Sequence, residues 1–205
     1  MKALCTTLAV LLAVVLGAVA AGAGLLFRGG ISAKVEPTGV ETAVGGKLRR
    51  IGIPRSFRQL RSPMDSSKEV LAAGRAHFAD HCAICHANDG SGQTEMGRNL
   101  YPRAPDLRLA RTQQLADGEL FYIVEYGVRL TGMPAWGDGS EQSTRASWHL
   151  VVFIRHLSQL TPEEKLEMER LNPKGPDEWR QMQEDEEFLE GKETSGHGHE
   201  EPRHH

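Results

Sequence analysis

The segment Cys82-Ala83-Ile84-Cys85-His86 constrains the fold of this chain more than any other feature of the sequence. A Cys-x-x-Cys-His pattern is the attachment signal for a c-type haem. Each thiol must reach one vinyl group of the same porphyrin, and one turn of backbone sets the separation of the two thiols. His86 then lies under the iron and offers its imidazole as a ligand. The segment therefore predicts one covalent haem, attached through Cys82 and Cys85, with His86 as an axial ligand of the iron.

Two other uses of a close cysteine pair fit this segment less well. A thioredoxin-like dithiol has no need of the following histidine and belongs to a β-α-β unit, which the sequence does not show. A zinc ion needs further cysteines or histidines at paired spacing. His77 and His81 are near enough to serve, so the residue count alone leaves zinc open. Covalent haem is the interpretation that uses every residue of the pattern.

A haem iron that carries electrons needs a second axial ligand, and the sequence offers two methionines. Met133 lies 47 residues after His86, between Gly132 and Pro134, where a loop can bring its thioether to the iron. Met96 lies only ten residues after His86, which is too close to pass easily round the porphyrin. Ligation by methionine and histidine raises the reduction potential and fills both axial positions, which suits electron transfer rather than oxygen binding. We therefore predict Met133 as the second ligand.

The N-terminus is a run of apolar and small residues from Ala3 to Phe27. A signal-peptide core has about 7–15 apolar residues, whereas a bilayer-spanning helix needs about 20. The run of 25 residues favours an uncleaved signal-anchor, although residues 18–20 and 21–23 also read as small-residue cleavage sites. Cys5 lies inside this run and is read as a small apolar residue.

The chain has a basic segment after the apolar run and an acidic segment at its C-terminal end. Residues 28–64 carry a balance of +6 and are punctuated by glycine and proline, which predicts a basic tether with little regular structure. Residues 161–205 carry a balance of −8 and end in a His-rich stretch of a kind that can bind metal ions. The overall charge of −3 predicts no nucleic-acid partner. The remaining composition is that of an ordinary globular protein and excludes a wholly disordered, collagenous or multi-span membrane chain.

Residues 66–160 resemble the class I cytochromes c, especially the small bacterial monohaem kind. The resemblance rests on Gly74 to Phe78, on the Cys-x-x-Cys-His segment, on Pro102 to Leu107 and on Gly127 to Trp136. It implies an all-α fold wrapped round one covalent haem c. Capping residues and apolar spacing independently predict helices over 66–80, 117–127 and 143–158.

The resemblance also suggests roles for residues around the haem. The first and last helices of the family cross where a glycine meets an aromatic residue, and Gly74 and Trp148 are the matching residues. A proline carbonyl receives the second ring N–H of the ligating histidine; Pro105 is the nearer match and Pro102 the alternative. Trp136 is expected to cover the haem or to bond a propionate. Further propionate partners are sought among Tyr101, Arg103, Arg108, Arg111 and Arg129.

We therefore expect a membrane-tethered electron carrier rather than an enzyme. The predicted parts are a signal-anchor (1–28), a basic linker (29–64), a cytochrome c domain (65–160) and an acidic, His-rich tail (161–205). The resemblance implies a haem domain facing the periplasm from the cytoplasmic membrane. A quinol-oxidising complex or a dehydrogenase is then the expected donor, and an oxidase or a soluble cytochrome the expected acceptor. Three alternatives remain open: a haem enzyme or gas sensor, a haem subunit of a larger oxidoreductase complex, and a metal-handling protein that acts through its tail.

Overall fold

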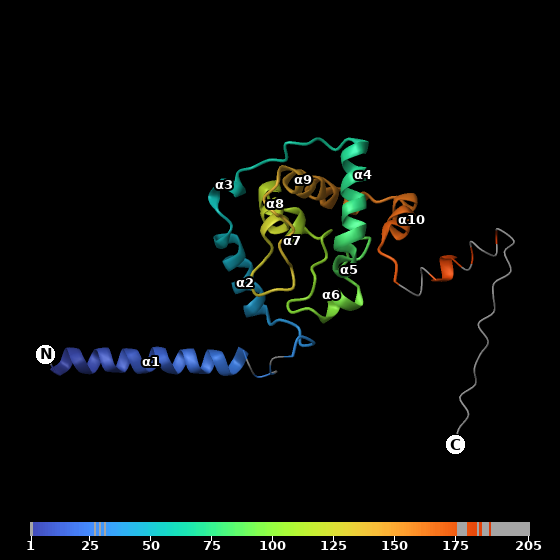
Figure 1. Cartoon of the computed structure of the whole chain (residues 1–205). Coiled ribbons are helices and arrows are strands. Elements are labelled where there is room, and N and C mark those ends of the chain that lie inside the picture. The colour runs from blue at the N-terminus through green and yellow to red at the C-terminus, as the bar shows by residue number, and fades with distance from the viewer. Residues whose placement is uncertain are drawn as a thin grey trace, which may run out of the picture.

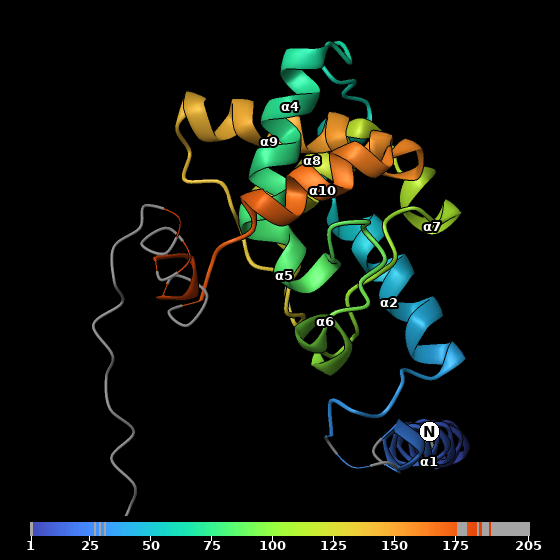
Figure 2. The same cartoon turned by 90° about the vertical axis from the view of Figure 1, so that its right-hand side faces the viewer.

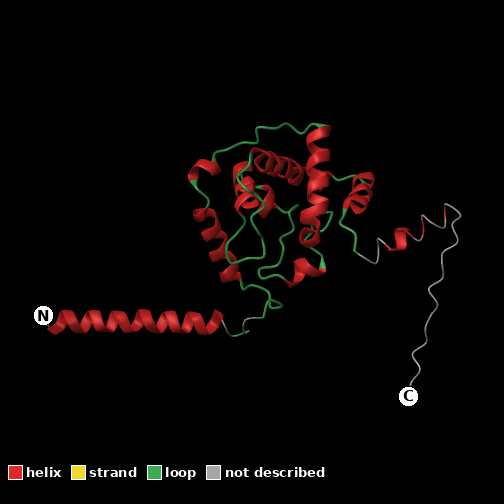
Figure 3. Cartoon of the chain, viewed as in Figure 1, coloured by secondary structure: helices red, strands yellow, loops and turns green. Residues whose placement is uncertain are grey.

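The computed structural model describes residues 2–26, 28, 30, 32–175, 180–183, 185 and 189. These residues form helices and loops, with no β-strand among them (Figure 3). The fold is the all-α cytochrome c fold, preceded by one long apolar helix (Figure 1). In chain order the helices are α1 (Lys2–Leu26), α2 (Gly39–Gly52), α3 (Arg55–Arg58), α4 (Lys68–His77), the π-helical turn η1 (Phe78–Cys82), α5 (Ala83–His86), α6 (Glu95–Asn99), α7 (Ala110–Gln113), α8 (Asp117–Tyr126), α9 (Glu141–His156), the 3-10 turn η2 (Leu157–Gln159) and α10 (Pro162–Leu171).

The core is built where α4 and α8 pack against α9. The three helices predicted for the domain are present, with ends shifted by two or three residues in α4 and α9. Gly74 is the closest point of the α4–α9 crossing, because a methyl group there would meet the carbonyl oxygen of His149 and lie 2.7 Å from Cβ of Phe153. The assignment of Trp148 to this crossing is wrong: its ring stacks on Phe121 of α8 at 4.4 Å instead. The crossing therefore depends on Gly74 and Phe153.

Gly74→Val is expected to destabilise the domain by about 1–3 kcal/mol, because the added side chain must displace the α9 backbone rather than a flexible side-chain end. Thermal unfolding of the haem-loaded protein, followed by circular dichroism, measures the loss. The matched control is Gly46→Ala in α2, where no atom lies within 4 Å of the added methyl group. This control should leave stability unchanged or raise it by up to about 1 kcal/mol. Equal unfolding temperatures for the two variants would contradict the close approach.

The prediction that residues 28–64 have little regular structure is wrong for about half of that segment, which forms α2 and α3. Thr38 and Glu41 form a reciprocal capping box that starts α2, with 14 residues in the helix. Ile53 is 2% exposed. Phe57 of α3 lies among the rings of α8, at 5.1 Å from Tyr122 and 6.1 Å from Phe121. A local start signal, buried Ile53 and partly buried Phe57 thus outweigh the glycines and prolines, and Phe57 packs the segment against the domain.

The folded unit also extends beyond residue 160. Residues Pro162–Leu171 of the predicted acidic tail form the helix α10, and its Met168 is completely buried in the core. Arg75 of α4 holds the helix in place through Glu164 at 3.0 Å and Glu167 at 2.7 Å. The His-rich end of the tail lies outside the described residues.

Helix α1 extends away from the helical domain (Figure 1). Within the described part of the chain, it is the one helix long and apolar enough to cross a membrane, over Lys2–Gly24. A secretory signal sequence near the N-terminus can pass the same test of length and composition, so this helix fits either an anchor or a signal.

Candidate functional site

The attachment segment starts in an irregular turn of helix. Continuation of α4 into the π-helical turn η1 places two successive side chains, Phe78 and Ala79, in the core, each 1% exposed. Phe78 packs on Phe153 at 5.4 Å between ring centroids. Such turns often occur at functional sites. Anchored in this way, η1 ends at Cys82, and the short helix α5 carries Cys85 and His86. The sequence pattern contained no signal for the π-helical turn.

The two thiols lack the lowered pKa of a redox dithiol. Both cysteines are free and half-buried. Burial raises the pKa of Cys82 to about 12, and burial also raises the pKa of Cys85. A catalytic dithiol requires the opposite change, a lowered thiol pKa. In the residues that the structure covers, no three His, Cys, Asp or Glu side chains converge as a metal-binding group, so the zinc alternative finds no support.

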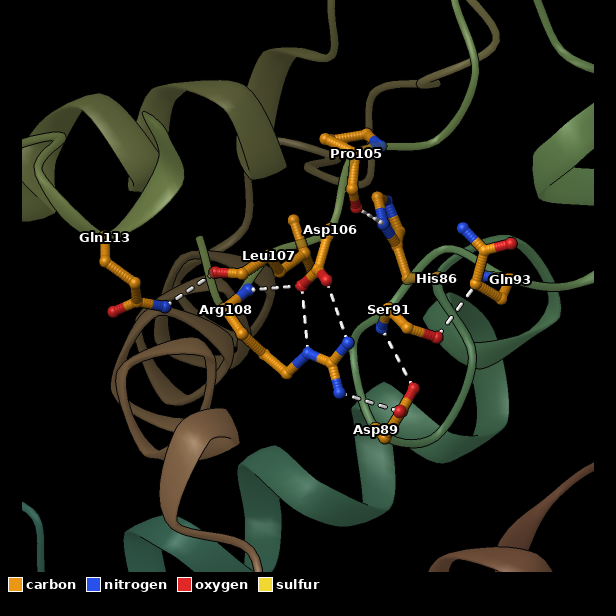
Figure 4. Close-up of polar contacts among 9 residues, drawn as sticks. All are labelled: His86, Asp89, Ser91, Gln93, Pro105, Asp106, Leu107, Arg108 and Gln113. Carbon is orange, nitrogen blue, oxygen red and sulfur yellow. Dashed lines mark hydrogen bonds and ion pairs between the residues drawn. The ribbon is translucent and has the colours of Figure 1, made fainter. Parts of the chain in front are cut away.

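His86 is oriented by a backbone carbonyl. Its Nδ1 lies 3.4 Å from the carbonyl oxygen of Pro105, a long hydrogen bond that leaves Nε2 for a metal (Figure 4). Of the two prolines considered, Pro105 is therefore the one whose carbonyl reaches the ring. Burial lowers the pKa of His86, although the bond to Pro105 partly opposes this effect. A neutral imidazole is the form that binds iron, and a backbone partner on the second nitrogen is the usual means of fixing the ring.

A charged cluster holds Pro105 in place. Arg108 donates to both carboxylate oxygens of Asp106, at 2.9 and 2.8 Å, and to Asp89 at 2.8 Å (Figure 4). The bond from Arg108 lowers the pKa of Asp106. Burial raises the pKa of Asp89, but its bonds from Ser91 and the charge of Arg108 outweigh that effect and leave it below the ordinary value. Arg108 thus ties the loop that follows His86 to the loop that carries Pro105.

Sequence reasoning considered Arg108 only as a propionate partner, together with Tyr101 and Arg103. All three have protein partners here, because Tyr101 donates to Glu41 at 2.8 Å and Arg103 to Glu36 at 2.6 Å. The spacing of residues in the sequence does not predict that an arginine will pair with two carboxylates in separate loops.

Arg108→Gln is expected to lower the stability of the haem-loaded protein by about 1–2 kcal/mol, the lower part of the range for charged hydrogen bonds, because the Arg108 side chain is 35% exposed. The Nδ1 proton of His86 should also exchange with solvent faster, since the Pro105 carbonyl is no longer held. Thermal unfolding and NMR exchange of that proton measure the two effects. Arg103→Gln removes the same charge from an exposed pair with Glu36 and should change neither. An unaltered exchange rate in Arg108→Gln would contradict the positioning role.

The loop containing Met133 is tied to the end of α8. Gly127 ends this helix with φ = 67°, and a side chain there would collide with the backbone of Pro134 at 2.6 Å. Within the loop, the N–H of Val128 donates to the Met133 carbonyl at 3.1 Å. Farther on, the N–H of Trp136 donates to the Val124 carbonyl at 3.1 Å. These hydrogen bonds fix the loop before and after Met133, whose side chain is half-buried. The rival methionine, Met96, lies on α6 and is 50% exposed.

Two further residues connect this loop to the rest of the domain. The ring of Trp136 meets His81, the residue before Cys82, edge to face at 5.2 Å. Buried Glu125 accepts from the N–H of Gly137 through its backbone at 2.9 Å and from the Ser147 hydroxyl through its side chain at 2.6 Å. The Met133 loop and the attachment helix therefore belong to one packed unit. Sequence reasoning singled out Trp136 but missed Glu125.

An all-α domain with this attachment helix, this oriented histidine and this methionine loop is a c-type cytochrome domain, a class that carries covalently bound haem c and transfers electrons. Residues 69–154 match the family described as "Cytochrome C oxidase, cbb3-type, subunit III". No curated protein matches the chain.

Proposed function

We propose that this protein is a membrane-anchored monohaem cytochrome that passes single electrons between redox proteins at the periplasmic face of the cytoplasmic membrane. The observation that carries the proposal is the bond between His86 and the Pro105 carbonyl, directly after a pair of free thiols. Haem c, when bound, supplies an iron that alternates between two oxidation states. The chain has to attach the haem, ligate the iron and limit access of water.

Attachment is the role we assign to Cys82 and Cys85. The two thiols would hold the haem through thioether bonds to its two vinyl groups. The burial of Phe78 and Ala79 supports this role, because it fixes the turn η1 that ends at Cys82 and leads directly into α5 with Cys85.

Ligation is the role we assign to His86 through Nε2 and to Met133 through its thioether sulphur. Both assignments are supported by preorganisation: the imidazole is oriented by Pro105, and the Met133 loop is bonded to α8. Held by these two residues, the haem would supply one-electron chemistry rather than oxygen binding. We assign Trp136 to covering the haem edge between these two segments.

Anchoring is the role we assign to α1, which limits the carrier to movement in the plane of the membrane. The donor is then a quinol-oxidising complex or a dehydrogenase, and the acceptor is an oxidase or a soluble cytochrome.

A second candidate function is favoured by the family match, whose description names a subunit of an oxidase. In that case the chain is a fixed electron-transfer subunit of a larger complex. Purification from membranes in mild detergent separates the two possibilities: a subunit elutes with its complex, and a shuttle elutes alone.

The test of the proposed function is a reduced-minus-oxidised spectrum of membranes that express the chain, with mass spectrometry of the purified protein. We expect a sharp c-type α band, the weak far-red band of a sulphur–iron bond in the oxidised form, and the added mass of one haem. A colourless protein without added mass would refute the proposal.

A further inference from the structure

The outward side of α2 carries a row of unpartnered apolar residues. Val40, Val44, Leu48 and Ile51 follow one another at intervals of four, four and three residues, the spacing of one helical face. They are 50–73% exposed. We call these four residues the α2 apolar face. An exposed apolar row of this kind marks an interaction surface.

The charges of α2 are divided between two sides. Its acidic residue, Glu41, is turned toward the domain, where it accepts from Tyr101 at 2.8 Å and from the N–H of Thr38 at 2.7 Å. The cations Lys47, Arg49 and Arg50 lie in the second half of the helix. Glu41 lies at the edge of the α2 apolar face, one turn before Val44, and its carboxylate is occupied by the bonds to Tyr101 and Thr38. Exposed Lys47 and Arg50 then leave the rest of this side apolar and basic.

We infer that α2 lies in the headgroup region of an anionic bilayer, with the α2 apolar face in contact with the lipid chains. A helix with a row of apolar residues bordered by lysine and arginine is suited to such a surface. Basic residues next to a membrane span are attracted to anionic headgroups. The inference rests on the proposed anchoring by α1, because only twelve residues separate the end of α1 from the start of α2. In both views α2 is on the side of the domain nearest to α1 (Figure 1, Figure 2).

This placement also orients the haem domain. α2 is bonded to Tyr101, and the side chain of the preceding residue, Leu100, lies against Gly132: a methyl group on Gly132 would be 2.6 Å from Cδ2 of Leu100. Gly132 is next to Met133. A helix held on the bilayer therefore keeps the Met133 side of the domain at a constant height above the lipid.

The experiment uses the full-length, haem-loaded protein in lipid nanodiscs, with Cys5→Ala so that a single introduced cysteine takes an environment-sensitive fluorophore. Leu48→Cys places the label on the α2 apolar face. Thr42→Cys places it at an exposed position on another side of the same helix. The readout is the fluorescence ratio with and without doxyl-labelled lipid, in discs of phosphatidylcholine alone and in discs with about 30% phosphatidylglycerol.

We expect quenching at position 48 to exceed that at position 42 by about threefold or more in the anionic discs. Combined replacement of Lys47, Arg49 and Arg50 by glutamine should bring position 48 close to the control. Equal quenching at positions 48 and 42 in both lipids would overturn the inference. Shielding of position 48 in native membranes but not in lipid discs would also overturn it, and would assign the face to a protein partner.

The proposed function is checked in the same samples. An unchanged haem spectrum shows that the cytochrome is intact, and resistance of the native membrane protein to an alkaline carbonate wash shows that α1 is retained. With both controls satisfied, equal quenching counts against the α2 inference alone. Release by the wash counts against the anchor.

Discussion

A variant with Cys82→Ser and Cys85→Ser is expected to contain no covalently bound haem. The two thioethers are the covalent links that we assign between chain and porphyrin, and a serine hydroxyl does not replace a thiol in that addition. The domain should also lose stability, because the haem that we propose to be attached there would be missing. Haem-stained gels of membrane fractions and the mass of the purified chain measure attachment directly.

The matched control for this variant is Cys5→Ser, which alters the one other cysteine of the sequence, exposed on α1. Its haem content should equal that of the unaltered protein. A double serine variant with haem resistant to acid–acetone extraction would contradict the attachment site. A colourless Cys5→Ser variant at normal expression would show that haem loading depends on α1.

Met133→Ala is expected to lower the reduction potential by about 0.1–0.3 V, a fraction of the roughly 0.8 V range that axial ligands cover. A thioether favours ferrous iron, and the water that takes its place favours ferric iron. The far-red band of the oxidised protein should disappear, while covalent haem is retained. Potentiometric titration and the oxidised spectrum are the measurements.

Met96→Ala is the control, since Met96 is the rival methionine and is half exposed on α6. It should leave the potential and the far-red band unchanged. If Met133→Ala behaves like the unaltered protein and Met96→Ala shifts the potential, the ligand assignment is reversed. If neither variant alters the spectrum, the iron has no stable methionine bond, which favours a haem enzyme or a gas sensor.

The correctly predicted parts of the fold depend on patterns among residues that are close in the sequence. The all-α domain was implied by the resemblance to class I cytochromes c and supported by capped, apolar-periodic segments. The end of α8 followed from Gly127, which has the φ of 67° that a glycine adopts readily. The carbonyl partner of His86 was narrowed to two prolines, and only the folded chain brings Pro105 within 3.4 Å.

What the sequence did not disclose depends on contacts between distant residues. Trp148 was matched to Gly74 by analogy, yet its ring stacks on Phe121, 27 residues earlier. The glycines and prolines of residues 28–64 led to the wrong prediction for α2 and α3, because the packing of Phe57 depends on the aromatic rings of α8, more than sixty residues later in the chain. The pairing of Arg108 with Asp89 joins two loops, for which a linear pattern has no marker.

The docking of α2 and α3 reduces the distance over which the haem domain can search for partners. The predicted linker, residues 29–64, would span about 120 Å when fully extended, whereas the twelve residues between α1 and α2 span at most about 40 Å. With α1 in the bilayer, electron exchange is then confined to neighbours whose own redox centres lie close above the lipid. Encounter rates should accordingly follow lateral diffusion and local crowding in the membrane more than the concentration of soluble proteins in the adjoining compartment.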